Sequence, residues 1–494
     1  MSITLRPYQD AGVNEIRATY GKGKTAPLYV CPTGGGKTVL FAYIASSAAA
    51  KKLRSVIVCH RIELIKQAAR TLSDFGIDYG IIHPDFKPNY SKLIQIASIQ
   101  TLANRVEDLT RAGFAPRFLI YDEAHHGTAG MWTTVRASWP SPKTLTLGVT
   151  ATPVRTDGQG LGAQHQGGVY DALIMGPQIG ELIAAGYLVQ PDVYAPQKQV
   201  DLAGLDSGGK DYDVRELEEL VDRTAVTGDA VDNYRKYADG LPAVAFCVSI
   251  QHAEHVAEQF RAAGYRAYAV SGDKKKTPVK VRERVLKGLE NGETEVVCSC
   301  DLISEGTDIP ALACAILLRP TMSLAMYLQQ VGRVLRPVKD AAGKPLKERG
   351  IVLDHVGNSL RHGMPDEPRE WTLDGVVKEG KRKKGQAPPP PRVFSCPTCF
   401  AIHLPAPACI RCGYAYPAPE PEPIQEAKEG ELTLITEAIR ERILTAKERE
   451  IAEARTLEDL QKIAILRNYA PSWASHTWKM RERLRRPQLN LQTA

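Results

Sequence analysis

A glycine-rich run near the amino terminus carries the residue types that a nucleoside triphosphate requires. The run reads Thr33-Gly34-Gly35-Gly36-Lys37-Thr38. Consecutive glycines let backbone N–H groups come close to phosphate oxygens. In such a loop, Lys37 contacts the β- and γ-phosphates and Thr38 offers a hydroxyl to magnesium. A tight connection between a strand and a helix would be the alternative interpretation of the glycines alone.

An acidic motif follows farther along the chain. It reads Asp122-Glu123-Ala124-His125 and comes directly after the apolar run 118–121. We assign Asp122 to magnesium, through water, and Glu123 to orienting and deprotonating an attacking water. Because phosphoryl transfer depends mainly on positioning and charge, these carboxylates and Lys37 form a minimal catalytic set. A solvated acidic turn is the alternative.

Buried strands and helices must position these residues. The apolar stretch 28–31 predicts the strand that enters the glycine loop, and 39–50 predicts a helix that points its dipole at the bound anion. Further strands are predicted at 55–59, 93–97, 118–122, 144–149, 243–248, 295–300, 314–318 and 351–354. Strands separated by helices indicate parallel α/β sheets. The Gly- and Asp-rich stretch 201–213 divides them into two lobes, which we expect at residues 1–198 and 199–378.

Composition sets the broad class of protein. The chain has 494 residues, which exceeds the roughly 250–300 at which single cores stop growing. Lys and Arg number 63 against 56 Asp and Glu, so the net charge of +7 permits a polyanionic partner without proving one. Ten cysteines in a chain of this length indicate a reducing compartment. No apolar run is long enough for a membrane span, and no signal peptide is evident, so we expect a cytoplasmic protein of a bacterial or phage-infected cell.

The second lobe contains two arginines that could complete the site. Arg333 and Arg336 are three residues apart and would share one face of a helix. If this face closes over the nucleotide, both can neutralise charge on the γ-phosphate. Gly306 and Asp308 follow a predicted strand and would lie at the same cleft. A surface helix and a surface turn are the alternatives for these segments taken singly.

The order of these motifs resembles that of a superfamily 2 helicase with a DEAH box, over residues 5–337. The resemblance implies two tandem RecA-like parallel-sheet lobes, with ATP and Mg²⁺ as cofactors. It assigns adenine contact to Gln9. It assigns the coupling of hydrolysis to strand movement to Thr150, Thr152 and Gln329, with His125 as the partner of the threonines. It assigns contacts with the nucleic-acid backbone to Arg61, Gln100 and Thr101.

The layout is most similar to RadD-type DNA-repair ATPases and to type III restriction motors. The segments 155–158 and 186–188 also match that branch. Two residues depart from the usual pattern. Cys31 stands where the strict phosphate-loop pattern has glycine, and Gln330 stands where many relatives have an additional arginine.

Composition changes after residue 375, and three further segments are predicted. Residues 379–392 form a basic, proline-rich linker, either a solvated tether or an arm that contacts a nucleic-acid backbone. Residues 393–417 are predicted to form a zinc ribbon around Cys396, Cys399, Cys409 and Cys412, with paired disulfides as the rival. Residues 418–494 are predicted to be helical, and their aromatic and basic residues would either stack on bases or form a small helical core.

The sequence therefore predicts an ATP- and magnesium-dependent helicase or translocase, acting in DNA repair, recombination or phage replication. The preference for DNA over RNA comes from the resemblance alone, because the motifs contact backbones and read no bases. Two other functions stay open. The chain could be the motor subunit of a restriction system whose partner protein supplies the nuclease. It could also be a nucleotide-gated DNA-binding switch that recruits repair proteins without unwinding.

Overall fold

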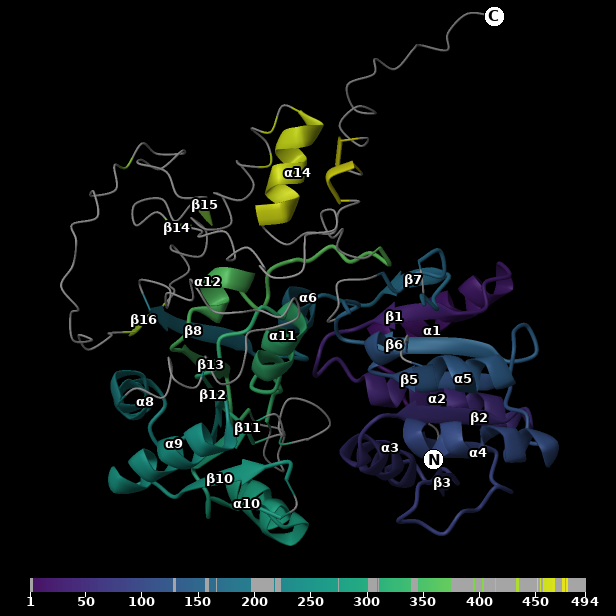
Figure 1. Ribbon diagram of the computed structural model, residues 1–494, viewed down its shortest axis with the longest axis horizontal. Helices are drawn as coiled ribbons and strands as arrows, with labels where there is room; N and C mark the ends of the chain where they lie inside the picture. The colour runs from purple at the N-terminus through teal and green to yellow at the C-terminus, as the bar shows by residue number, and fades with distance from the viewer. Residues whose placement is uncertain are drawn as a thin grey trace, which may run out of the picture.

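The computed structural model describes most of residues 3–374 and short stretches beyond them. The described residues are 3–127, 130–155, 160–165, 167–196, 217, 224–273, 275–300, 309, 311–338 and 345–374, then 394–395, 402–403, 414, 432–434, 451, 454, 456–466, 473–475 and 477–478. The four cysteines predicted to bind zinc, Gly306, Asp308 and the linker 379–392 lie outside these ranges. Two α/β lobes make up the described part, one at the right of Figure 1 and the other at the left.

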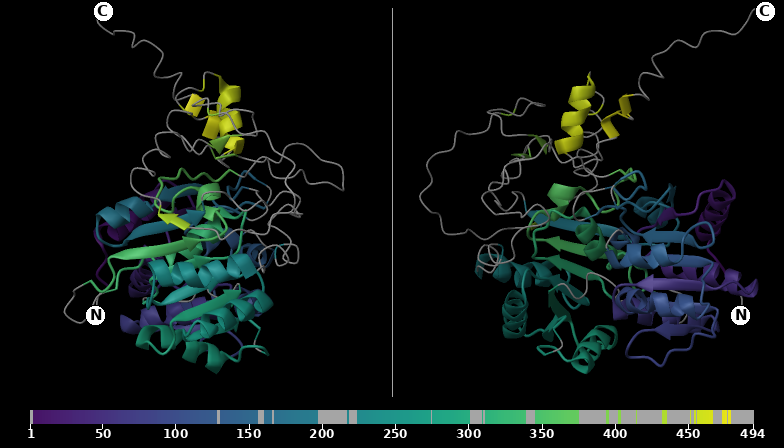
Figure 2. Two further views of the ribbon diagram at one scale, coloured as in Figure 1. Left: turned by 90° about the vertical axis from the view of Figure 1, so that its left-hand side faces the viewer. Right: turned by 45° about the vertical axis from the view of Figure 1, so that its right-hand side comes forward.

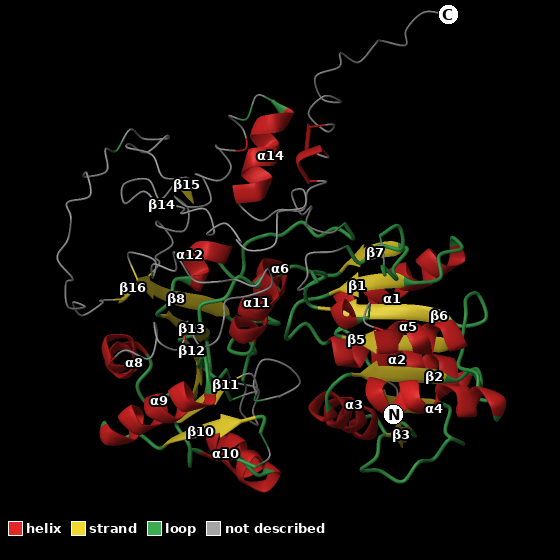
Figure 3. Cartoon of the chain, in the orientation of Figure 1, coloured by secondary structure: helices red, strands yellow, loops and turns green. Residues whose placement is uncertain are grey.

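The first lobe is built on a seven-stranded parallel sheet with the order β3-β4-β2-β5-β6-β1-β7. Its strands are β1 (Pro27–Val30), β2 (Ser55–Cys59), β3 (Gly80–Ile82), β4 (Ile94–Ser98), β5 (Phe118–Asp122), β6 (Leu145–Thr150) and β7 (Ala172–Met175). Its helices are α1 (Pro7–Gly21), α2 (Lys37–Ala50), α3 (Ile62–Asp74), α4 (Ile99–Arg111) and α5 (Gly130–Ser138), with a short 3₁₀ helix at Ala124–His126. Helices flank this sheet in Figure 3.

Both faces of this sheet are covered, which explains why its strands are continuously apolar. Along β1, Leu28 and Val30 pack with residues of α4 and α5, whereas Tyr29 packs with residues of α1, α2 and α3. All four residues of β1 are buried. The central strands of such a sheet therefore bring their carboxyl ends, and the loops that follow, to one edge.

The second lobe has a seven-stranded sheet with the order β10-β11-β9-β12-β13-β8-β16. Its strands are β8 (Gln190–Pro196), β9 (Ala243–Phe246), β10 (Ala267–Ser271), β11 (Val296–Cys300), β12 (Cys314–Leu317), β13 (Arg349–Asp354) and β16 (Leu432–Leu434), of which β16 is antiparallel to β8. Its helices are α6 (Ile179–Ala184), α8 (Thr224–Tyr237), α9 (Ile250–Ala262), α10 (Val279–Asn291), α11 (Leu324–Gly332) and α12 (Asn358–His362). Residues of α10 and α11 pack on one face of the sheet, and residues of α8 and α9 on the other.

The strands predicted from the sequence are all present, with ends that differ by at most two residues. Those the sequence did not predict are β3, β7, β8, β10 and β16, together with the short antiparallel pair β14 (Phe394–Ser395) and β15 (Ile402–His403). β8 lies inside the range 1–198 that the sequence assigns to the first lobe, yet it pairs with β13. The sheet of the second lobe therefore takes in a strand that precedes residue 198.

In the described part of the chain, two segments cross between the lobes, which lie side by side in the right-hand view of Figure 2. The first, residues 176–189, leads from β7 through α6 to β8, and we call it the connector. The second, residues 364–374, follows α12 and returns to the first lobe, and we call it the strap. The carbonyl of Leu373 in the strap accepts hydrogen bonds from the backbone N–H groups of Leu161 and Gly162, both at 2.9 Å. Among the described residues, the connector and the strap therefore both link the two lobes.

Beyond the lobes, the described residues include helix α14 (Leu457–Leu466). Leu460, Ile463 and Ala464 of this helix form a small buried cluster with Ala454 and Ala474, against which Trp473 and Trp478 pack. None of the helices in the described part of the chain is both long enough and apolar enough to cross a bilayer.

Candidate active site between the lobes

The glycine loop joins β1 to α2 and leaves its backbone uncovered. Gly34 and Gly36 have φ angles of +85° and +76°, which side chains of L residues rarely adopt. A Cβ on Gly35 would lie 2.4 Å from the Sγ of Cys31, and one on Gly36 would lie 2.5 Å from the Nε2 of Gln9. These positions therefore favour glycine, whose small size lets an anion come close to the backbone of the loop.

Side chains of α1 and β1 hold this loop in place. The hydroxyl of Tyr8 donates to the carbonyl of Gly35 at 2.9 Å, and the Nε2 of Gln9 donates to the carbonyl of Gly36 at 3.1 Å. The thiol of Cys31 is buried and donates to the Gly35 carbonyl at 3.6 Å. Burial raises the pKa of this thiol to about 11, so it is neutral at pH 7. The departure at Cys31 therefore fills the space under the loop without adding charge.

Lys37 and Thr38 are the first two residues of α2, directly after the left-handed residue Gly36. The ammonium group of Lys37 lies 3.3 Å from the carbonyl of Cys31, so it stays at the base of the loop. Both residues belong to the first turn of the helix, and the N–H groups of that turn point toward the anion site. The sequence predicted this helix at 39–50, and the structure begins it two residues earlier, at Lys37.

The carboxylates lie at the end of β5. Asp122 is the last residue of the strand, and its Oδ1 accepts a hydrogen bond from the backbone N–H of Glu123 at 3.0 Å. Glu123 has a φ of +47°, an uncommon conformation for a residue with a side chain. Its Oε2 is buried and has no hydrogen-bond partner. Strained backbone and an unsatisfied buried oxygen cost free energy, and both are typical of residues that act on a ligand.

The threonines predicted to couple the site to movement lie next to these acids. The Nδ1 of His125 is 3.1 Å from the Oγ1 of Thr150 and 3.5 Å from the Oε2 of Glu123. Thr150 in turn donates to the carbonyl of Thr152 at 3.1 Å. β5 and β6 are neighbours in the sheet, which is why residues 25 positions apart meet here. His125 thus links the acidic motif to the threonine segment.

The arginine segment of the second lobe lies against the glycine loop. The expectation that Arg333 and Arg336 share one face of a helix is wrong, because helix α11 ends at Gly332, and Arg333, which is buried, caps it. A Cβ on Gly34 would lie 3.5 Å from the Cγ of Arg336, and one on Gly332 would lie 2.7 Å from the Cβ of Thr33. Burial lowers the pKa of Arg336 to about 10, which leaves the guanidinium charged at neutral pH. A cation from one lobe therefore borders the phosphate cradle of the other.

The remaining predicted residues are those of the second lobe and those predicted to contact nucleic acid. Gln329 is buried on α11, whereas Gly306 and Asp308 lie outside the described residues. Of the predicted nucleic-acid contacts, Arg61 caps the start of α3, and Gln100 is exposed, with its Nε2 3.4 Å from the carbonyl of His60. Thr101 is buried, and its hydroxyl accepts a hydrogen bond from Ser98 inside the lobe.

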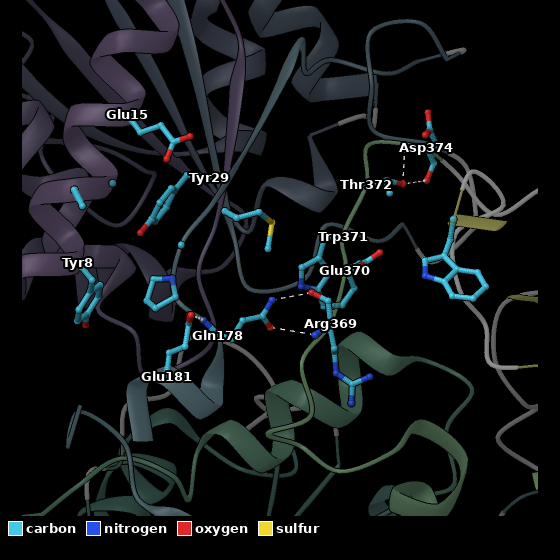
Figure 4. A pocket seen from close by; sticks show the side chains of 16 residues that line it. Tyr8, Glu15, Tyr29, Gln178, Glu181, Arg369, Glu370, Trp371, Thr372 and Asp374 are labelled. Carbon is cyan, nitrogen blue, oxygen red and sulfur yellow. Dashed lines mark hydrogen bonds between the residues drawn. The ribbon is translucent and has the colours of Figure 1, made fainter. Parts of the chain in front are cut away.

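A cavity of about 810 Å³ lies between α1, the connector and the strap. Its lining includes Tyr8, Glu15, Tyr29, Gln178, Arg369 and Trp371, which surround it in Figure 4. Sequence reasoning missed the strap and the connector as parts of this region. The one signal was the segment 186–188, which resembled a family pattern without a stated role.

The residues present fit a triphosphate with magnesium. The loop is a cradle that added Cβ atoms would fill, and the buried Oε2 of Glu123 makes no hydrogen bond within the protein, with the Nδ1 of His125 3.5 Å away. Thr38 and Asp122 supply the oxygen ligands that magnesium prefers. The site therefore has an anion cradle, a set of cation ligands, a candidate base and an opposing guanidinium.

Comparison with known proteins places this arrangement in a family context. The chain matches the family described as "Type III restriction enzyme, res subunit" over residues 2–155, and "Helicase conserved C-terminal domain" over residues 228–338. It is 30% identical over 458 residues to a "51.5 kDa protein" of a Lactococcus phage, which covers 90% of this chain and 92% of the phage protein.

More distant relatives share the two lobes. "DNA 3'-5' translocase XPB2" of Sulfurisphaera tokodaii is 25% identical over 369 residues, which cover 68% of this chain and 79% of the relative. The solved structure "ATP-dependent Type ISP restriction-modification enzyme LlaBIII bound to DNA" has a TM-score of 0.52 and 17% identity, covering 71% of this chain and 27% of that chain. The second comparison shows a common fold.

Proposed function

The chain belongs to the superfamily 2 helicases related to restriction-type enzymes, and we propose that it hydrolyses ATP at the seam between its lobes and uses the cycle to move along DNA. The observation that carries this proposal is the position of the Arg336 stem, whose Cγ lies 3.5 Å from the place that a Cβ on Gly34 would take. A phosphate cradle alone would support nucleotide binding. A guanidinium from the other lobe, set against that cradle, supports hydrolysis linked to lobe movement.

We assign the chemistry to four residues of the first lobe and two arginines of the second. Lys37 holds the β- and γ-phosphates, and Thr38 and Asp122 hold magnesium. Glu123 orients the attacking water and takes its proton through Oε2, which makes no hydrogen bond within the protein. Bound magnesium would neutralise negative charge on the phosphate oxygens. Arg336 and Arg333 would stabilise the charge of the transition state from the second lobe.

Movement would follow from the loss of the γ-phosphate. With the triphosphate gone, Arg336 loses its anionic partner, and the second lobe is free to shift relative to the first. His125 touches both Glu123 and Thr150, so a change at the acid reaches the end of β6. Arg336 is attracted more strongly to the triphosphate than to the diphosphate. This difference in binding free energy favours one arrangement of the lobes before hydrolysis and another after it.

We propose DNA as the polymer. Support comes from the Sulfurisphaera relative, which is named a DNA translocase, and from the similar structure that was solved bound to DNA. Arg61 and Gln100, at the carboxyl ends of neighbouring strands, are the residues we propose for backbone contact. The hydroxyl and the backbone N–H of Thr101 are both bonded to Ser98 inside the lobe, so we assign no contact with the polymer to this residue.

The test is the rate of ATP hydrolysis measured with single-stranded DNA, duplex DNA, forked DNA and RNA. We expect DNA to stimulate turnover and Lys37→Ala to abolish it. A strand-displacement assay with the same substrates separates unwinding from a binding switch. If none of the four polymers raises the rate above that of the protein alone, the translocase proposal fails.

A second candidate is the motor subunit of a restriction system. The match of residues 2–155 to the restriction-enzyme family favours it. This function needs a partner protein that supplies the nuclease, and a methyltransferase or nuclease subunit that co-purifies with the untagged chain would support it. A chain that moves along DNA at full rate in the absence of other proteins would favour an independent translocase.

We also propose a structural zinc ion for residues 393–417, after the linker 379–392 and before the helical segment 418–494. Cys396, Cys399, Cys409 and Cys412 would provide four thiolate ligands and leave no open coordination position. The reducing compartment inferred from the cysteines, the cytoplasm, would keep these thiols available. Zinc measured at one equivalent per chain in native protein supports the assignment, whereas metal-free protein with oxidised thiols contradicts it.

A further inference from the structure

The connector touches the phosphate loop directly. The Cδ2 of Leu188 lies 2.8 Å from the position that a Cβ on Gly34 would take, and the Cδ1 of Leu182 lies 3.4 Å from that of Gly35. Both leucines are at most 3% exposed. The connector thus places two apolar side chains under the backbone that would cradle the triphosphate.

The same segment is bonded to the arginine segment. The backbone N–H of Val189 donates to the carbonyl of Leu335 at 2.8 Å, one residue before Arg336. Leu188 also packs in the core of the second lobe with residues of α11 and of the segment after it, Leu335 among them. Leu188 therefore contacts the loop of one lobe while it belongs to the core of the other.

A second route joins the connector to the loop from the side of α1. The ring of Tyr187 meets the ring of Tyr8 edge-on, with centroids 5.1 Å apart. Tyr8 donates its hydroxyl to the carbonyl of Gly35 at 2.9 Å. The guanidinium of Arg6 lies 4.6 Å from the centre of the Tyr187 ring and donates to the Tyr8 hydroxyl at 3.1 Å. Tyr187 is thereby linked to the loop through Tyr8.

We propose that Leu188 and Tyr187 are positioning residues for hydrolysis, which set the separation between the phosphate loop and Arg336. This inference rests on the proposed function. Protein interiors are close-packed, so a loop displacement at Gly34 must move Leu188, the stem of Arg336 or both. Because Leu188 is adjacent to Val189, which is bonded to Leu335, the displacement reaches the arginine segment through the backbone. A misplacement of about 1 Å in such a site costs roughly 10² in rate.

The alternative is that Leu188 only fills the core of the second lobe. Leu289 on α10 provides a matched control, because it is buried in the same core and no contact places it at the loop. Leu188→Ala and Leu289→Ala remove the same atoms, and both should lower the midpoint of urea unfolding. Only a positioning role predicts that the two variants differ in turnover.

The experiment measures kcat and KM for DNA-stimulated ATP hydrolysis at a temperature where all variants are folded. We expect Leu188→Ala to lower kcat by about 10²-fold with little change in KM, whereas Leu289→Ala keeps the wild-type kcat. Leu188→Met, which conserves volume, should restore turnover. Equal losses for the two alanine variants, or no rescue by methionine, would overturn the inference.

The Tyr187 pair provides a second test should Leu188→Ala not fold. Tyr187→Ala should lower kcat, and Tyr187→Phe, which keeps the ring against Tyr8, should not. Identical kinetics for these two variants would contradict the proposed route. Wild-type protein that shows no ATP hydrolysis would instead refute the proposed function, and this inference with it, so the two failures are distinguishable.

Discussion

The side-chain amide of Gln178 and the backbone of Arg369 exchange two hydrogen bonds. The Nε2 of Gln178 donates to the Arg369 carbonyl at 2.8 Å, and the Arg369 N–H donates to the Oε1 of Gln178 at 3.2 Å (Figure 4). Gln178 caps the start of α6 in the connector, and Arg369 lies in the strap. The connector and the strap are therefore hydrogen-bonded to each other where both line the cavity next to α1.

Gln178→Ala removes both of these hydrogen bonds and should loosen the strap. Since a hydrogen bond contributes about 1 kcal/mol net, we expect the free energy of unfolding to fall by about 1–2 kcal/mol. Amide hydrogen exchange should speed up at 369–374. The control is Gln251→Ala, an exposed residue of α9. Unchanged exchange in the strap of Gln178→Ala would show that other contacts hold it.

Gly36→Ala tests the cradle. The φ of +76° strains any residue with a Cβ, and that Cβ would lie 2.5 Å from the Nε2 of Gln9. Gly240→Ala is the matched control, because Gly240 has a φ of +72° and open space around it. Both variants should lose about 1–2 kcal/mol of stability from backbone strain.

Only Gly36→Ala should lose nucleotide binding, because the clash pushes Gln9 from the Gly36 carbonyl and distorts the loop. A fluorescent ATP analogue measures the affinity of each variant. Equal affinities for Gly36→Ala and Gly240→Ala would mean that this part of the loop does not touch the nucleotide.

The cradle and the acids could be predicted from the sequence because their residue types have few other uses at that spacing. The glycines before Lys37 predict both a strand-to-helix loop and phosphate binding. The apolar run that ends in Asp122 predicts both a buried strand and a magnesium ligand. For Gln9 the sequence predicted base contact, and the structure adds a bond from its amide to the Gly36 carbonyl. That bond depends on how α1 packs on the loop, which no local pattern records.

The connector and the strap could not be predicted in the same way. Leu188 is one apolar residue among many, and its contact with Gly34 exists only because the second lobe docks where it does. The strap binds the first lobe through the carbonyl of Leu373, a group that every residue possesses. β8 was missed because its residues alternate between buried and half-buried positions, so it lacks the continuous apolar run that marked the other strands. Its partner, β13, also comes more than 150 residues later.

His355 should make the protein less stable in mild acid. It is buried directly after β13, and burial lowers its pKa from 6.5 to about 4. As the pH falls below 6.5, the unfolded chain binds a proton that the folded chain does not bind until about pH 4. The unfolded state is favoured in that window, so stability present above pH 6.5 is lost on acidification.

The size of this effect is about 2 kcal/mol between pH 8 and pH 5, from one histidine. Urea unfolding at both pH values measures it. His355→Gln should show a smaller drop than the wild type, because glutamine does not titrate. Identical drops in the two proteins would indicate that His355 titrates normally when folded.

Glu123→Gln should separate nucleotide binding from hydrolysis. Glutamine has the same shape and keeps the contacts of the buried side chain, but it cannot accept a proton from water. General base catalysis contributes about 10²–10⁴ in rate, and we expect hydrolysis to fall by that factor. ATP affinity should be retained or increased, because Lys37 and the glycine loop are unchanged. Single-turnover hydrolysis and equilibrium binding of ATP measure the two quantities.

Glu107→Gln, at an exposed residue of α4 in the same lobe, is the control and should hydrolyse ATP at the wild-type rate. The backbone supports the assignment to Glu123, since a φ of +47° at a non-glycine residue persists only where the surroundings fix it. That conformation leaves the Oε2 of Glu123 buried without a hydrogen-bond partner. Full turnover by Glu123→Gln would move the base to another residue and leave this strain without a function.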